Sequence, residues 1–111
     1  MSKRELREVE KFVKDRADRL IREIRAKAKG RVKEQLSEAL WGLKGSLNYE
    51  KVSKDKRAFE RLIEIDEKIF TDLYVIKMAL DEKRKEGIKE LAEDLIRLRK
   101  ERKGLELQGG L

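Results

Sequence analysis

This chain of 111 residues contains no histidine, no cysteine and no proline. Histidine and cysteine supply most general bases, activated nucleophiles and zinc–thiolate sites, so their absence excludes those chemistries. Carboxylates on helices could still hold Mg²⁺, but no spacing in the sequence specifies such a site. We therefore expect a protein that is not an enzyme, with no cofactor, no metal and no small-molecule substrate.

Long apolar runs are absent too. No stretch approaches the ~18 consecutive apolar residues that a membrane-spanning helix needs, and the charged residues of Met1–Glu5 do not resemble a secretory signal. We expect a cytoplasmic protein without a membrane partner. Asn and Gln are scarce while Lys, Glu and Arg are abundant, a composition typical of proteins from thermophiles.

Charged residues make up 48% of the chain, and the formal net charge is +7. Residues 1–52 hold 15 Lys and Arg against nine Asp and Glu, so most of the excess lies in the first half. We call its main carriers the basic run: Arg16, Arg19, Arg22, Arg25, Lys27, Lys29, Arg31 and Lys33. Such a run could contact the phosphates of DNA or RNA without sequence selectivity. The alternative is an ordinary solvated helix face, which the scatter of these residues around the helix favours.

The apolar residues follow helical periodicity. Ser2 and Glu5 form the Ser-x-x-Glu pattern of a capping box, and apolar residues then recur at steps of three and four. This pattern predicts an amphipathic helix over residues 3–29. A second apolar stripe follows Gly30, rotated by roughly 90° on a straight helix. Because glycine costs about 1 kcal/mol relative to alanine inside a helix, we expect the chain to break near Gly30.

Glycines also divide the second half of the chain. Residues 45–52 are the predicted loop, and Ser53 is the predicted N-cap of a second long helix. The apolar stripe of that helix stays in phase across Gly87. Residues 54–103 therefore form either one long helix or two helices joined by a tight turn.

These patterns predict an all-α protein, an antiparallel bundle of long amphipathic helices. Either four helices pack together, or a long helical hairpin dimerises, because two helices alone bury little surface. Gly104 predicts the last helix end. We expect one domain over residues 1–104 and a loose tail over residues 105–111.

Two residues depart from the apolar pattern. Asp66 lies on an apolar stripe, one heptad after Phe59 and one before Leu73, and a carboxylate there is costly unless it is paired. We expect a buried ion pair, or a polar residue that fixes helix register and oligomeric state. Trp41 lies off its local stripe, where it either anchors an interface with a partner or folds back against the neighbouring loop.

The stretch from Lys56–Phe59 through Asp72–Lys77 resembles part of the helical domain of GINS replication subunits, in which a triplet such as Asp-Leu-Tyr precedes basic residues on a long helix. The resemblance covers about a quarter of the chain and implies a replication-associated scaffold. The sequence departs from the family pattern after the triplet, where Met78–Asp81 replace the basic cluster.

Two functions follow from these features. The first, which the strong amphipathic stripes favour, is a non-catalytic interaction or assembly protein that binds another protein or a second copy of itself. The second is a basic nucleic-acid-associated protein that contacts DNA or RNA through residues 16–33.

Overall fold

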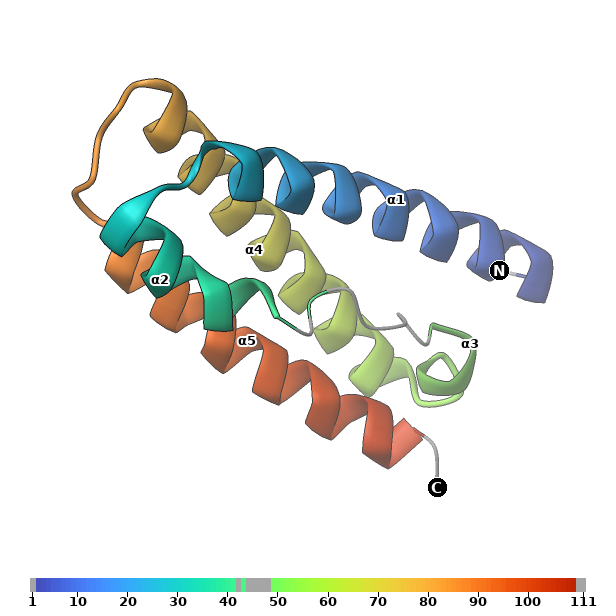
Figure 1. The fold of residues 1–111 in the computed structure, drawn as a ribbon. Helices are drawn as coiled ribbons and strands as arrows, with labels where there is room; N and C mark the ends of the chain where they lie inside the picture. The colour runs from blue at the N-terminus through green and yellow to red at the C-terminus, as the bar shows by residue number, and fades with distance from the viewer. Residues whose placement is uncertain (1, 42, 44–48, 110–111) are drawn as a thin grey trace.

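A computed structural model describes residues 2–41, 43 and 49–109. This part of the chain contains helices and no strand. The helices are α1 (Lys3–Lys27), α2 (Gly30–Leu40), α3 (Tyr49–Val52), α4 (Lys56–Asp81) and α5 (Ile88–Gly109), shown in Figure 1. The predicted all-α bundle is confirmed, with four long helices and one short turn of helix.

The start and the end of α1 both follow the sequence. Ser2 Oγ accepts a hydrogen bond from the N–H of Glu5 at 3.2 Å, and the Glu5 carboxylate accepts one from the N–H of Ser2 at 3.4 Å. Ala28 and Lys29 are extended, and Gly30 has a φ of +63°. A left-handed φ is inexpensive for glycine alone. The predicted break near Gly30 is therefore confirmed, and it turns α2 back along the bundle.

The start of α4 differs from the prediction. Ser53 as the N-cap is wrong, because the Asp55 carboxylate accepts the N–H of Ala58 at 3.2 Å and caps the helix. Ser53 Oγ instead donates to the carbonyl oxygen of Glu50 at 2.9 Å. The loop predicted over residues 45–52 is wrong for Tyr49–Val52, which form α3, while residues 45–48 lie outside the described residues.

Residues 54–103 form two helices rather than one. The C-terminus of α4 is closed by hydrogen bonds from the N–H of Arg84 to the Ala79 carbonyl at 2.8 Å and from the N–H of Lys83 to the Leu80 carbonyl at 3.1 Å. This is a Schellman motif, in which the left-handed position usually belongs to glycine. Here Lys83 occupies it with a φ of +58°. Gly87, with a φ of +81°, then leads into α5.

The last helix is longer than predicted. The helix end predicted at Gly104 is wrong, because α5 continues to Gly109. Leu105 packs against both apolar clusters of the core, which offsets the cost of a glycine inside the helix. Residues 105–109 are therefore not a loose tail, and residues 110–111 lie outside the described residues.

The long helices pack in parallel and antiparallel pairs. Figure 1 shows α1 beside α4 and α2 beside α5, each pair running in one direction, whereas α4 and α5 are antiparallel. Lys77 Nζ lies 3.5 Å from a Glu23 carboxylate oxygen and joins the last turns of α4 and α1. Arg61 Nη2 lies 2.9 Å from a Glu101 carboxylate oxygen and joins the start of α4 to the second half of α5.

Two apolar clusters hold the helices together. The larger one takes residues from all four long helices, among them Ile24, Leu36, Leu73 and Leu95. The smaller one lies where α3 packs between α1 and α4. Each fully buried Leu or Ile side chain contributes about 1.5–3 kcal/mol, so the aliphatic residues supply most of the stability.

We predict that Lys83→Gly stabilises the fold by about 0.5–1 kcal/mol, because glycine adopts the left-handed φ without strain. Urea unfolding followed by circular dichroism measures the change. Glu82→Gly is the control, since Glu82 has a right-handed φ of −88° and gains nothing from glycine. A Lys83→Gly variant that is less stable than the wild type would contradict a strained turn.

Candidate functional site

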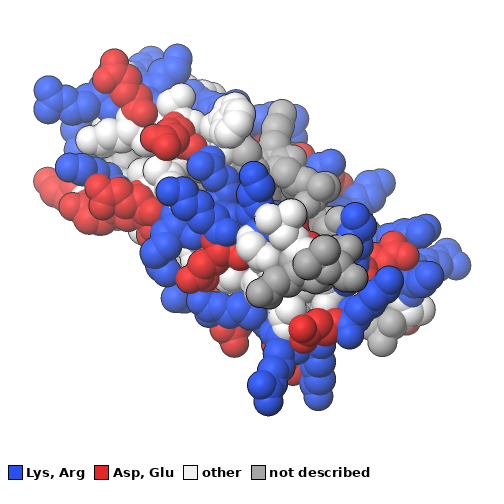
Figure 2. Space-filling model, turned by 90° about the horizontal axis from the view of Figure 1, so that it is seen from below, with Lys and Arg blue, Asp and Glu red and all other residues white. Residues whose placement is uncertain are grey.

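The eight side chains of the basic run are all exposed, but they do not form one surface. Asp15 and Asp18 lie among the α1 arginines and line a shallow hollow together with Arg19 and Arg22. From Arg25 to Lys33 no acidic residue intervenes, and this part forms the elbow between α1 and α2. The face drawn in Figure 2 carries Lys and Arg interspersed with Asp and Glu.

Asp66 lies in the core, 6% exposed, and is paired. Its Oδ2 accepts a hydrogen bond from the Tyr49 hydroxyl at 2.8 Å, and its Oδ1 accepts one from Arg102 Nε, also at 2.8 Å. Burial raises the pKa of Asp66, and the charge of Arg102 opposes that rise. Burial and the nearby carboxylate also raise the pKa of the Tyr49 hydroxyl. Asp66 thus joins α4 to α5 through a buried ion pair and joins α4 to α3 through a hydrogen bond. The ion pair is the first of the two roles that the sequence allows.

α1 contributes Glu10 to the surroundings of this ion pair. Burial raises the pKa of Glu10, while the backbone N–H of Tyr49 and the charge of Arg102 lower it. Arg102 Nη1 also lies 3.1 Å from a Glu106 carboxylate oxygen. Sequence reasoning identified Asp66 but neither partner, because Tyr49 and Arg102 are 17 and 36 residues away and belong to other helices.

Asp72 is a second buried acid, which the sequence did not indicate. Asp72 is 9% exposed at the contact between α4 and α5. Burial, a hydrogen bond to Asp94 and the charge of Asp94 raise the pKa of Asp72 to about 7, against the charges of Lys68 and Arg97. The same hydrogen bond and the adjacent Arg97 lower the pKa of Asp94. Below neutral pH, the Asp72 carboxyl is therefore expected to keep its proton, while the lowered pKa of Asp94 keeps that carboxylate charged.

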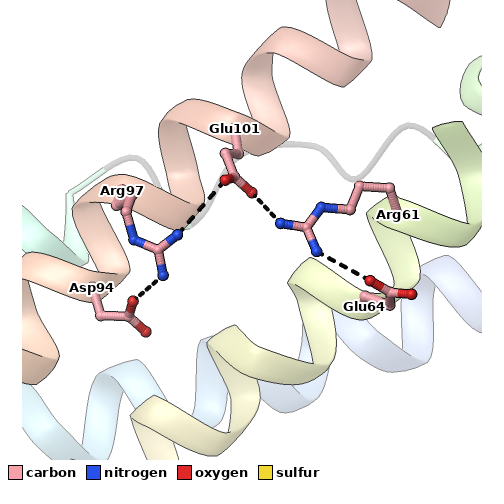
Figure 3. Close-up of polar contacts among 5 residues, drawn as sticks. All are labelled: Arg61, Glu64, Asp94, Arg97 and Glu101. Carbon is pink, nitrogen blue, oxygen red and sulfur yellow. Dashed lines mark hydrogen bonds and ion pairs between the residues drawn. The ribbon is translucent and has the colours of Figure 1, made fainter.

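Asp94 begins a chain of alternating charges along the α4–α5 contact (Figure 3). Arg97 pairs with Asp94, and its Nη1 lies 3.6 Å from a Glu101 oxygen. Arg61 bridges Glu101 at 2.9 Å and Glu64 at 3.0 Å. Exposed pairs contribute only about 0.2–1 kcal/mol each, so the chain's main effect is to align the two helices.

Trp41 is 71% exposed, so the prediction that it folds back against the loop and is shielded is wrong. The guanidinium of Arg99 lies 5.9 Å from the centre of its ring. Arg99 also donates hydrogen bonds to the carbonyls of Trp41 and of Glu38, the latter at 3.1 Å. A cation suits this position, because the last carbonyls of α2 lack helical partners. A role for Trp41 in an interface stays a prediction.

An exposed apolar surface lies where α1 and α4 run side by side. Arg16, Arg19 and Leu20 from α1 and Phe70, Thr71, Tyr74 and Val75 from α4 line a groove of about 360 Å³. Tyr74 is 52% exposed, and Met78, one helical turn further on, is exposed as well. Phe12 lies exposed one turn before Arg16. We call this surface, the groove with Phe12 and Met78, the α1–α4 face.

The two rims of the α1–α4 face carry opposite charges. On the α1 rim, the Arg16 guanidinium lies 5.7 Å from the centre of the Phe70 ring, and Arg19 makes no ion pair with any described residue. On α4, Glu60 and Glu67 precede Tyr74 at heptad spacing and are exposed on the same stripe. Neither glutamate makes an ion pair within the described residues. The α1 rim thus carries Arg16 and Arg19 next to Asp15 and Asp18, and the α4 rim carries glutamates. Charges on both rims make no ion pair within the described residues.

We predict that Asp66→Leu destabilises the protein by about 3–5 kcal/mol, because it leaves the Arg102 guanidinium buried without its carboxylate. Urea unfolding gives the free energy of the variant, of Arg102→Leu and of the double variant. The double variant should be more stable than either single one, since it removes both charges together. If the double variant instead lost the sum of the two single losses in unfolding free energy, Asp66 and Arg102 would not form a buried pair.

We predict that the unfolding free energy of the wild type falls as the pH rises from about 5 to about 8, by on the order of 2 kcal/mol more than in Asp72→Asn. The folded protein holds a proton on Asp72 up to a pKa of about 7, whereas an unfolded aspartate releases it near its ordinary value. The stabilisation is therefore present in mild acid and is lost as the pH passes about 7. Identical pH profiles of the two proteins would show that folding does not raise the pKa of Asp72.

Comparison with protein-family models, with curated proteins and with solved structures finds no match to this chain. No helix in the described part is long and apolar enough to cross a bilayer. Among the same residues, no three Asp or Glu side chains come together in a way that could hold a metal ion. The α1–α4 face and the distribution of charge are therefore the features from which function can be inferred.

Proposed function

We propose that the protein is a non-catalytic assembly protein that pairs with a second copy of itself through the α1–α4 face. The observation that carries this proposal is the set of exposed apolar side chains around a groove, on two helices that run side by side. Soluble monomers rarely expose a contiguous apolar surface of this kind, and such surfaces mark interaction sites. Tyrosine in particular is enriched in the buried centres of interfaces.

The charges of the two rims favour a second copy as the occupant. A two-fold axis directed along the helices would lay α1 of each copy over α4 of the other. The unpaired arginines of one rim would then lie opposite the unpaired glutamates of the other rim, twice in each dimer. Opposite charges that meet across an interface fix its register and exclude other partners.

The size of the face also suits a dimer. α1 and α4 have 25 and 26 residues, so each is about 38 Å long at ~1.5 Å per residue. Two such helices side by side present roughly 750 Å², and a stable interface buries about 800 Å² on each partner. The α1–α4 face, together with the turns of α1 and α4 on either side of it, is therefore large enough for a specific dimer without any contribution from the other helices.

We predict that the wild type sediments as a dimer and that Tyr74→Glu together with Met78→Glu sediments as a monomer, because the two carboxylates would be buried in the interface. Sedimentation equilibrium gives the mass, and circular dichroism checks the fold. Leu107→Glu is the matched control, since Leu107 is an exposed apolar residue on α5, outside the face. A dimer that survives the Tyr74 and Met78 changes would place the interface elsewhere.

A charge swap then tests the register. Arg19→Glu and Glu67→Arg should each weaken the dimer, because like charges would meet across the interface. The double variant should recover at least part of the lost affinity. The two side chains do not pair within one chain, so a recovery can come only from contact between copies. If the double variant lost as much dimer affinity as the two single variants together, the two rims would not face each other.

A further inference from the structure

Two basic segments that are far apart in the sequence meet at one end of the bundle. Figure 1 shows the α1–α2 elbow and the α4–α5 turn at the same end. Lys27 pairs with Asp81 across them, and Ala28 and Ile88 belong to one apolar cluster. We call residues 25–34 and 81–90 the basic end.

The basic end holds more than half of the net charge of the chain. It contains nine Lys and Arg against five Asp and Glu, a net charge of +4 out of the total of +7. Two of the five acids are already engaged, Asp81 by Lys27 and Lys77, and Glu82 by Arg84 at 2.7 Å. The acids without an ion pair in the described structure are Glu34, Glu86 and Glu90.

Most of the cations at this end are uncommitted. Seven of them make no ion pair with any described residue, whereas only three acids at this end make none. All seven are exposed: Arg25, Lys29, Arg31, Lys33, Lys83, Lys85 and Lys89. An anion with several charges could therefore meet cations from both segments at once without displacing an existing pair.

The backbone at the starts of α2 and α5 adds to the positive charge of the basic end. α2 and α5 run in the same direction and both begin at the basic end. The residue before α2, Lys29, makes no side-chain capping hydrogen bond. The first N–H groups of a helix carry a partial positive charge, so two parallel helix starts strengthen the attraction of the surrounding cations for anions.

From this arrangement we infer that the basic end binds the phosphodiester backbone of nucleic acid. A backbone presents negative charge at regular intervals, which suits cations spread over two segments. Residues 25–34 and 81–90 contain no aromatic side chain that could stack on bases, so binding is independent of sequence. Arg16, Arg19 and Arg22 of the basic run are not part of this site, because they lie along α1 beside Asp15 and Asp18.

The test is fluorescence anisotropy with labelled duplex DNA, duplex RNA and single-stranded DNA, and with labelled poly-glutamate as the acidic-protein probe. The wild type should bind nucleic acid at low salt. With about four phosphate contacts, its affinity should fall roughly 10²-fold between 50 and 200 mM salt. The three nucleic-acid arms show which backbone geometry fits best.

The variant Lys29→Glu, Arg31→Glu, Lys85→Glu should bind nucleic acid at least about tenfold more weakly than the wild type, since three phosphate contacts become repulsive. The matched control is Lys51→Glu, Lys56→Glu, Lys103→Glu, which has the same net charge but is changed in exposed residues of α3, the start of α4 and the second half of α5. A much smaller loss in the control supports the basic end.

Three results would overturn the inference. They are no binding of nucleic acid at low salt, equal losses in the two triple variants, and binding of poly-glutamate as tight as that of nucleic acid. Circular dichroism of each variant confirms that the helices remain folded. The α1–α4 face is unchanged in both triple variants, so self-association and nucleic-acid binding are tested separately.

Discussion

The parallel packing of α1 on α4 is the constraint on which the other features depend. The two helices are held level by Glu23 with Lys77 and by Lys27 with Asp81 near their ends, and Leu6 shares the smaller apolar cluster with Leu62 near their starts. Because both helices end at the same level, the elbow after α1 and the turn after α4 lie together. The same alignment joins their outer surfaces into the α1–α4 face.

Buried polar groups fix the rest of the bundle. The ion pair of Asp66 with Arg102 sets α5 against α4, and the hydroxyl of Tyr49 brings α3 to the same carboxylate. Elsewhere along the α4–α5 contact, the raised pKa of the buried Asp72 favours its neutral form, and the charge stays on the half-buried Asp94, which pairs with Arg97. An aliphatic core tolerates small shifts of one helix along another, whereas these groups lose their partners if the register changes.

Local features could be predicted from the sequence, and their partners could not. The capping box of Ser2 and Glu5 and the break at Gly30 depend on residues within one turn, and both are as expected. Ser53 and Asp55 are both good N-caps, and only the packing of α3 decides between them. The end of α4 could not be predicted, because Lys83 stands where glycine usually marks a helix end. A left-handed lysine costs only about 1 kcal/mol, which the two hydrogen bonds of the turn offset. Asp66 was conspicuous on an apolar stripe, but its partners and Asp72 become visible only when α4 and α5 lie together.

We propose above that two copies meet at the surface that joins α1 and α4. The most direct measurement is the amide NMR spectrum of the labelled protein as a function of concentration. If two copies meet there, signals from residues 12–23 of α1 and 67–78 of α4 shift or broaden as the concentration rises, while those of the second half of α5 stay fixed. Concentration-independent spectra, or changes confined to α5 or α2, would contradict it.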